Sequence, residues 1–201
     1  DYNPYTSFKN HTLNEEKGIQ QVREELSDLI DVLLKKNKLQ RCLEIGLGFF
    51  GSTHFLFRQM FDTTITIESN FERIRLFGRN SKKYYNEFIL SDGKSKFYHG
   101  ISNAVDTVTN VYNNEQEVDF LFIDGNHTYE QVLADFLMYS PLVKAGGIIA
   151  FHDTIHVDSF NEAVPNLMNE ISDGKFTNGK KIQVKHIHKS LTQGISYFYK
   201  K

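Results

Sequence analysis

The chain has 201 residues, of which 40% are hydrophobic and 24% are charged, which are ordinary proportions for a globular domain with a sizeable core. Its net charge is −2, so no positive field is available to hold a phosphate backbone, and we exclude nucleic acid as a main partner. The single cysteine, Cys42, excludes a disulfide scaffold and a cysteine-based zinc site. Apolar stretches are of strand length and no signal-peptide pattern precedes the first periodic segment, so we expect a cytoplasmic protein without a membrane partner.

Residues 1–40 are predicted to form a tail and a helix, which together are a candidate cap on a core of residues 41–201. The first ten residues show no periodicity and are compatible with a disordered tail or with a flap over a site. Thr12 and Glu15 have the spacing of a capping box, and apolar residues that include Val22 then recur at helical intervals up to the lysine-rich segment 35–38. A helix outside the sheet is also compatible with contacts in a homo-oligomer.

From residue 41 onward, strand-like and helix-like segments alternate, and no linker divides the chain. The predicted strands are Arg41–Ile45, Thr63–Glu68, Lys96–His99, Val118–Asp124 and Gly147–His152. The predicted helices lie at about 51–61, 70–89, 102–112, 128–143 and 158–172. Residues 182–190 and 194–200 are joined through Gly194 and predict a C-terminal antiparallel hairpin. This order predicts a single α/β domain over residues 1–201, with a Rossmann-like, doubly wound sheet of seven mostly parallel strands.

The first predicted strand runs into a glycine-rich turn, CLEIGLGFFGST. Gly46, Gly48 and Gly51 have the spacing of a dinucleotide-binding loop, with the strand before it and the helix after it that this pattern requires. Glycines let a ligand approach the backbone, and a helix that begins near Ser52 directs its N–H groups into the same space. The alternative is an ordinary tight turn between a strand and a helix.

Glu68 ends the second predicted strand, where an acidic side chain can accept hydrogen bonds from both hydroxyls of a ribose. A surface glutamate is the alternative, but the preceding run Thr63–Ile67 indicates a buried strand. At this point a nicotinamide cofactor and S-adenosylmethionine fit equally well, because both contain adenosine.

Two later segments, IDGNHTYE and GGIIAFHD, favour one of these two cofactors. Together with the glutamate two residues before Gly46, they resemble the class I S-adenosylmethionine-dependent methyltransferases, and within them the metal-dependent branch that methylates hydroxyls of sugars and small molecules. The resemblance extends from about Arg41 to the C-terminus. It implies that Glu44, Gly46 and Ser52 lie beside the methionine part of the cofactor and that Glu68 holds its ribose. Ile101 and Ser102 would flank the adenine, although the segment HGIS lacks the acidic residue that relatives often have there.

The resemblance further implies a divalent metal ion, with magnesium expected and manganese as an alternative, bound by Asp124, His152 and Asp153. Relatives often have an acidic residue in place of His152, and imidazole suits zinc, iron or manganese better than magnesium. The two aspartates follow neighbouring parallel strands, so their carboxylates are expected to meet at one edge of the sheet. A divalent ion there would lower the pKa of an acceptor hydroxyl, and His127 would serve as the general base.

Other interpretations of these residues stay open. Asp124 is also placed to cap the following helix, in competition with Asn126 and Thr128, and His127 is compatible with an ordinary loop histidine. The leading rival function is an NAD(P)-dependent oxidoreductase, but no Tyr-x-x-x-Lys pair lies on a predicted helix. A third possibility is a non-catalytic domain that binds a nucleoside cofactor. From the resemblance we expect the acceptor to be a hydroxyl of a small molecule, and the sequence does not identify that molecule.

Overall fold

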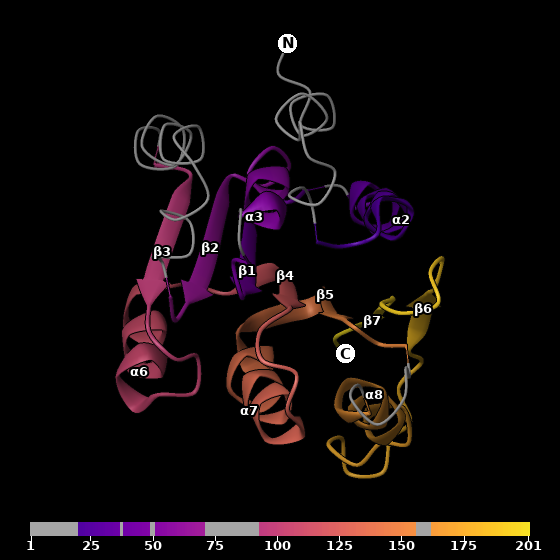
Figure 1. Ribbon diagram of the computed structural model, residues 1–201. Helices are drawn as coiled ribbons and strands as arrows, with labels where there is room; N and C mark the ends of the chain where they lie inside the picture. Colours follow the sequence, from indigo (N-terminus) through magenta and orange to yellow (C-terminus); the bar gives the residue numbers. More distant parts are fainter. Residues whose placement is uncertain (1–19, 37, 49–50, 71–92, 156–161) are drawn as a thin grey trace.

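A computed structural model describes residues 20–36, 38–48, 51–70, 93–155 and 162–201 of the chain. Seven strands of this part form one sheet in the order β3-β2-β1-β4-β5-β7-β6 (Figure 1). The strands are β1 (Arg41–Ile45), β2 (Thr63–Glu68), β3 (Ser95–His99), β4 (Val118–Ile123), β5 (Val143–His152), β6 (Lys185–Ile187) and β7 (Ile195–Tyr199). The first five are parallel, whereas β7 runs antiparallel to both β5 and β6. The predicted Rossmann-like sheet with a C-terminal antiparallel hairpin is confirmed.

Helices cover both faces of this sheet, which makes it doubly wound. Figure 1 shows α6, α7 and α8 on one side of the sheet, and α2 and α3 on the other. The helices are α2 (Arg23–Leu34), α3 (Ser52–Phe57), α6 (Val105–Asn114), α7 (Tyr129–Tyr139) and α8 (Ala163–Ser172), and a 3₁₀ turn at Ser140–Leu142 follows α7. Within the described residues, no helix is both long enough and apolar enough to cross a lipid bilayer.

Two hydrophobic cores follow from the alternation of side chains along the strands. Leu43 and Ile45 of β1 belong to the core under α6, α7 and α8, whereas Cys42 belongs to the core under α2 and α3. β4 divides in the same way, with Leu121 on the first face and Phe120 on the second. Both faces of the central strands are therefore buried, as their nearly continuous apolar sequences predict.

The strand ends agree with the prediction at β1 and β2, and β3 and β4 differ by one residue. β5 begins at Val143 and not at Gly147. Val118 of β4 pairs with Val143 and Phe120 with Ile148, so several extra residues of β5 bulge between these two pairs. Gly146, with φ +75°, makes the bulge possible.

The predicted N-terminal helix is partly wrong. Residues 1–19 lie outside the described part, which removes the capping box and the tail or flap from view, and α2 begins at Arg23 with Val22 in an extended conformation. The Nε2 of Gln21 donates a hydrogen bond to Asp124, and the Nε2 of Gln193 donates to the carbonyl of Gln20. These contacts hold Gln20 and Gln21 in bends before the extended Val22, so the helix begins only at Arg23.

The other described helices also differ from their predicted bounds, and α7 ends at Tyr139 where the prediction extends to 143. α3 ends at Phe57, because Gln59 N and Met60 N donate to carbonyls three residues earlier and tighten the chain into a turn. α6 begins at Val105, and α8 is described from Ala163. The predicted helix at 70–89 and the start of the one at 158–172 fall almost entirely outside the described residues.

Candidate functional site

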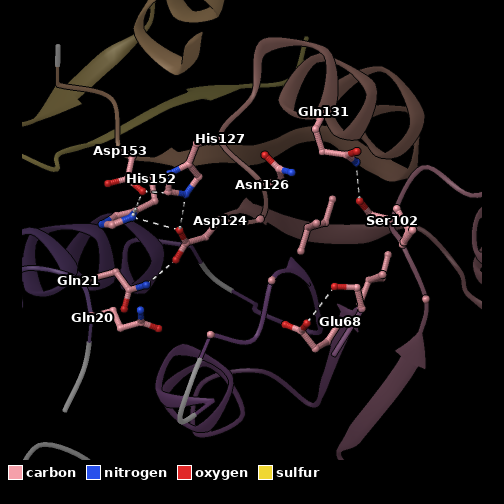
Figure 2. A pocket seen from close by; sticks show the side chains of 18 of the residues that line it. Gln20, Gln21, Glu68, Ser102, Asp124, Asn126, His127, Gln131, His152 and Asp153 are labelled. Atoms are coloured by element: carbon pink, nitrogen blue, oxygen red, sulfur yellow. Dashed lines mark hydrogen bonds and ion pairs between the residues drawn. The ribbon is translucent and has the colours of Figure 1, made fainter. Parts of the chain in front are cut away.

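A cavity of about 760 Å³ opens at the carboxyl ends of the parallel strands (Figure 2). Its walls come from the segments that follow β1, β2, β3, β4 and β5, with β1 and β4 at its centre, where the strand order reverses. Ligands of open α/β sheets bind at this point, and the volume is in the range of small-molecule sites. The predicted site residues that line it are Gly46, Gly48, Glu68, Ile101, Ser102, Asp124, His127, His152 and Asp153.

Gly46 lies in the floor of the cavity with φ +92°, a conformation that favours glycine. A Cβ atom at this position would stand 2.1 Å from the carbonyl oxygen of Asp124 and 3.0 Å from the Cα of Gly125. The glycine is therefore required by its approach to the loop after β4. Gly48 and Gly51 also have positive φ, and Gly51 precedes the first turn of α3 without lining the cavity.

Glu68 is 6% exposed at the end of β2, and its carboxylate reaches back to the glycine-rich loop. One oxygen accepts a hydrogen bond from the backbone N–H of Leu47 at 2.9 Å, and the other accepts from the N–H of Asn70 at 2.7 Å. These contacts fix the carboxylate at the cavity wall, where it retains lone pairs for further donors.

Glu44 lies beneath the cavity and does not line it. Its carboxylate is fully buried and accepts hydrogen bonds from the hydroxyls of Thr53 and Thr66. Burial raises the pKa of Glu44 to about 8, against the opposing effect of these two hydrogen bonds. Ser52 is also buried and does not line the cavity. Contacts of Glu44 and Ser52 with a ligand stay predictions, whereas Glu44 is observed to join α3 to β2 through Thr53 and Thr66.

Four side chains converge at the other end of the cavity from Glu68 and Ser102 (Figure 2). The Nδ1 of His152 lies 3.1 Å from Asp124 Oδ1 and 3.0 Å from Asp153 Oδ2, and the Nε2 of His127 lies 3.0 Å from the same Asp153 oxygen. We call these four residues the acid–histidine cluster. Parallel β4 and β5 bring Asp124 and the His152–Asp153 pair together, as predicted from their places at the strand ends.

Asp153 has φ +56°, a left-handed conformation that is uncommon for a residue with a side chain. Asp124 does not cap α7, because Asn126 accepts the hydrogen bond from the N–H of Thr128 at 2.9 Å. The cap interpretation of Asp124 is therefore wrong. The carboxylate of Asp124 instead meets His152 and the amide of Gln21.

The charges in the cluster are strongly coupled. Burial lowers the pKa of His152, but the carboxylates of Asp124 and Asp153 outweigh it and raise that pKa to about 10. The hydrogen bond with Asp153 raises the pKa of His127. For Asp153, burial raises the pKa, but the hydrogen bonds and charges of the two histidines outweigh it and leave the pKa well below its usual range.

The donor set fits a divalent cation. One ligand atom from each of Asp124, His152 and Asp153 lies within 4.8 Å of the others. The Nδ1 of His152 faces two carboxylate oxygens, an arrangement that needs either a hydrogen on Nδ1 or a metal ion in its place. Two carboxylates and one imidazole suit manganese, iron or zinc as well as magnesium.

Several lining residues were missed by the sequence analysis. Gln20, Gln21 and Gln193 line the end of the cavity that holds the acid–histidine cluster. Gln193 is carried by the loop between β6 and β7, whose backbone N–H groups at Lys189, Ser190 and Gly194 donate to the buried carboxylate of Glu25 in α2. No local sequence pattern predicts the bonds between this loop and Glu25, because they join segments more than 160 residues apart.

Gln131 of α7 was also missed, and it lines the end of the cavity that holds Ser102. Its Nε2 donates to Ser102 Oγ at 2.9 Å and to Asp135 Oδ1 at 3.0 Å. Asp135 is completely buried, and burial raises its pKa to about 6 against the hydrogen bonds from Ser102 and Gln131. A signal existed, since residues 131, 135 and 139 are spaced by four and share one face of a helix.

The chain resembles known proteins in both sequence and structure. Residues 43–154 match a family described as a methyltransferase domain. A curated relative, protein R132 of Acanthamoeba polyphaga mimivirus, is 50% identical over 36 residues, which are 18% of this chain and 16% of that protein. The chain therefore spans well under two thirds of the curated relative that it matches.

Solved structures resemble this one over most of its length. An O-methyltransferase of Bacillus cereus in complex with S-adenosylhomocysteine has a TM-score of 0.69 at 13% identity, over 100% of this chain and 92% of the other. The O-methyltransferase TomG of Streptomyces achromogenes, in complex with S-adenosylmethionine and involved in tomaymycin synthesis, has 0.65 at 15%, over 90% and 82%. The Podospora anserina methyltransferase PaMTH1, bound to S-adenosylhomocysteine, has 0.62 at 16%, over 98% and 86%. At these identities the likeness shows the fold.

Proposed function

The chain belongs to the methyltransferase-domain family, and we propose that it transfers a methyl group from S-adenosylmethionine to a hydroxyl of a small molecule, assisted by a divalent metal ion. One observation carries the proposal. A single cavity joins a carboxylate at the end of β2, Glu68, with the acid–histidine cluster after β4 and β5. The first feature suits a ribose and the second suits a metal-bound hydroxyl.

The cofactor would lie across the carboxyl ends of β1 and β2. Glu68 would accept hydrogen bonds from the ribose hydroxyls, and the missing side chain of Gly46 lets the loop after β4 approach the floor of the cavity. Ile101 and Ser102 would flank the adenine. S-adenosylmethionine supplies a methyl group on a sulfonium, and the bound complexes of the Bacillus cereus and Streptomyces achromogenes proteins support this choice of cofactor.

Asp124, His152 and Asp153 would hold the divalent ion. When bound, the ion lowers the pKa of the acceptor hydroxyl and fixes its direction. The carboxylate of Asp153 accepts a hydrogen bond from the Nε2–H of His127, which leaves the lone pair of Nδ1 to take the proton of the acceptor. His127 is 45% exposed at its side chain, so the proton can pass on to solvent.

The alternatives find less support. A nicotinamide-dependent oxidoreductase would use the same glycine-rich loop and Glu68, but the family match and the acid–histidine cluster favour methyl transfer. A non-catalytic nucleoside-binding domain would not need two aspartates and two histidines at the far end of the cavity.

The test is a turnover assay with labelled S-adenosylmethionine and a panel of polyhydroxylated and phenolic acceptors. Formation of S-adenosylhomocysteine that requires an acceptor, is lost with EDTA and returns with magnesium or manganese would support the proposal. Full turnover after exhaustive chelation would remove the metal from the scheme. Reduction of NAD⁺ by an alcohol of the panel, without methyl transfer, would overturn it altogether.

A further inference from the structure

We propose that Gln131 determines the base specificity of the cofactor site by accepting a hydrogen bond from the 6-amino group of adenine through its amide oxygen Oε1. Asp135 is the positioning residue that fixes the direction of this amide. The inference rests on the proposed function, because it assumes an adenosine cofactor whose ribose is held by Glu68.

Residues on one face of α7 form hydrogen bonds with the loop that follows β3. Gln131, Asp135 and Tyr139 lie one helical turn apart, and all three bond to Ser102 (Figure 2 shows the contact of Gln131). Gln131 Nε2 and Asp135 Oδ1 meet the Ser102 hydroxyl at 2.9 and 2.5 Å, and the Tyr139 hydroxyl donates to the Ser102 carbonyl at 2.5 Å. Three contacts on one serine hold this wall of the cavity to α7.

The hydrogen-bond partners of Gln131 permit only one orientation of its side-chain amide. An ionised Asp135 can only accept hydrogen bonds, and its Oδ1 lies 3.0 Å from Gln131. Ser102 already donates its single hydroxyl hydrogen to Asp135, so toward Gln131 it also acts as an acceptor. The atom of Gln131 that faces both must be the –NH₂ group, because the reversed amide would set its oxygen against two acceptors.

The other amide atom, Oε1, is then available to a ligand in the cavity. Within the described residues, Gln131 Oε1 has no hydrogen-bond partner, and Gln131 lines the cavity beside Ile101 and Ser102. A fixed acceptor at this end favours a base with an amino group. Adenine offers one at position 6, whereas hypoxanthine and guanine carry an oxygen there, which would oppose Oε1 without a hydrogen between them.

The buried carboxylate of Asp135 is accounted for by its role as a hydrogen-bond acceptor on α7. Asp135 has no exposed surface, and its Oδ2 has no hydrogen-bond partner in the part of the chain that the structure describes. Such burial costs stability, because one oxygen of the carboxylate has no hydrogen-bond donor. Here the carboxylate serves as a fixed acceptor for Ser102 and Gln131.

The experiment is calorimetric titration at about pH 8 with two probes, S-adenosylhomocysteine and S-inosylhomocysteine, which differ at position 6 of the base. We expect the wild-type protein to prefer the adenine probe by about tenfold or more, the usual scale for one hydrogen bond replaced by an opposed pair. Gln131→Met should reduce the ratio of the two dissociation constants to near one. Gln116→Met, a matched change at an exposed glutamine far from the cavity, should keep the wild-type ratio.

Ser102→Ala adds an independent check on the orientation. It removes one of the two acceptors that face the amide, so the ratio should fall to an intermediate value, and thermal stability should also fall because the buried carboxylate of Asp135 loses a donor. An unchanged ratio in Gln131→Met, or no preference in the wild-type protein, overturns the inference and leaves the proposed function standing. Failure of the wild-type protein to bind either probe overturns both.

Discussion

The substitution Gly46→Ala tests one contact of the site, the approach of position 46 to the carbonyl oxygen of Asp124. The added Cβ would stand 2.1 Å from the carbonyl oxygen of Asp124, and atoms this close must separate by about 1 Å. Either the loop that begins at Asp124 moves or Gly46 abandons φ +92°. We expect a loss of about 2–4 kcal/mol in the free energy of unfolding, composed of the left-handed conformation and the overpacking. The shift of Asp124 should also lower turnover by about a hundredfold.

Gly146→Ala is the matched control. Gly146 has φ +75°, but a Cβ there would meet no atom within 4 Å, so this variant carries the conformational cost without the clash. Thermal denaturation followed by circular dichroism should show a fall of about 2–4 °C for Gly146→Ala and about two to three times as much for Gly46→Ala. Titration with S-adenosylhomocysteine should show a weaker affinity in Gly46→Ala alone. Equal losses of stability with unchanged affinity would refute the assignment of Gly46 to its contact with Asp124.

Four further changes test other parts of the account. Glu68→Ala should weaken S-adenosylhomocysteine binding by about 1–3 kcal/mol in calorimetry, since the ribose loses charge-assisted hydrogen bonds, and an unchanged affinity would remove Glu68 from the cofactor site. Asp153→Asn should cut turnover far more than cofactor affinity, because the metal acts on the acceptor; parallel losses in both measurements would contradict this role. His127→Ala should lower turnover by about a hundredfold or more at constant cofactor affinity, the scale expected for a general base, and near-normal turnover would exclude that role. Glu44 has its pKa raised from 4.5 to about 8 by burial, so the stability linked to its proton is full below pH 4.5 and is lost as the pH rises through 8. In urea denaturation, Glu44→Gln should therefore lose about 4 kcal/mol less stability than wild type between pH 5 and pH 9, whereas identical pH profiles would show that Glu44 is ionised throughout.

The fold and the two ends of the site follow from local sequence features. Short segments rich in apolar and β-branched residues define β1 and β2, and their ends place Gly46 and Glu68 without knowledge of any other segment. Asp124 and Asp153 converge because parallel strands end at the same edge of a sheet. In each case, a periodicity and one rule of sheet topology are enough.

The remaining features depend on contacts between distant segments. Gln21 donates a hydrogen bond to Asp124 across 103 positions of sequence, and at Gln21 the chain forms a bend where helical periodicity predicts a helix. The place of Glu44 depends on Thr53 and Thr66, two hydroxyls that compensate a buried carboxylate beneath the loop. A periodicity describes one segment at a time, so it does not show which polar side chains from other segments will meet there.

The central claim is that the cavity between Glu68 and the acid–histidine cluster binds S-adenosylmethionine. The most direct measurement is calorimetric titration of the wild-type protein with S-adenosylhomocysteine and, separately, with NAD⁺, each repeated on Glu68→Ala. The account predicts saturable binding of S-adenosylhomocysteine that is weakened by the substitution, and no binding of NAD⁺. Saturable binding of NAD⁺ without binding of S-adenosylhomocysteine, or binding of S-adenosylhomocysteine that is indifferent to Glu68→Ala, would contradict it.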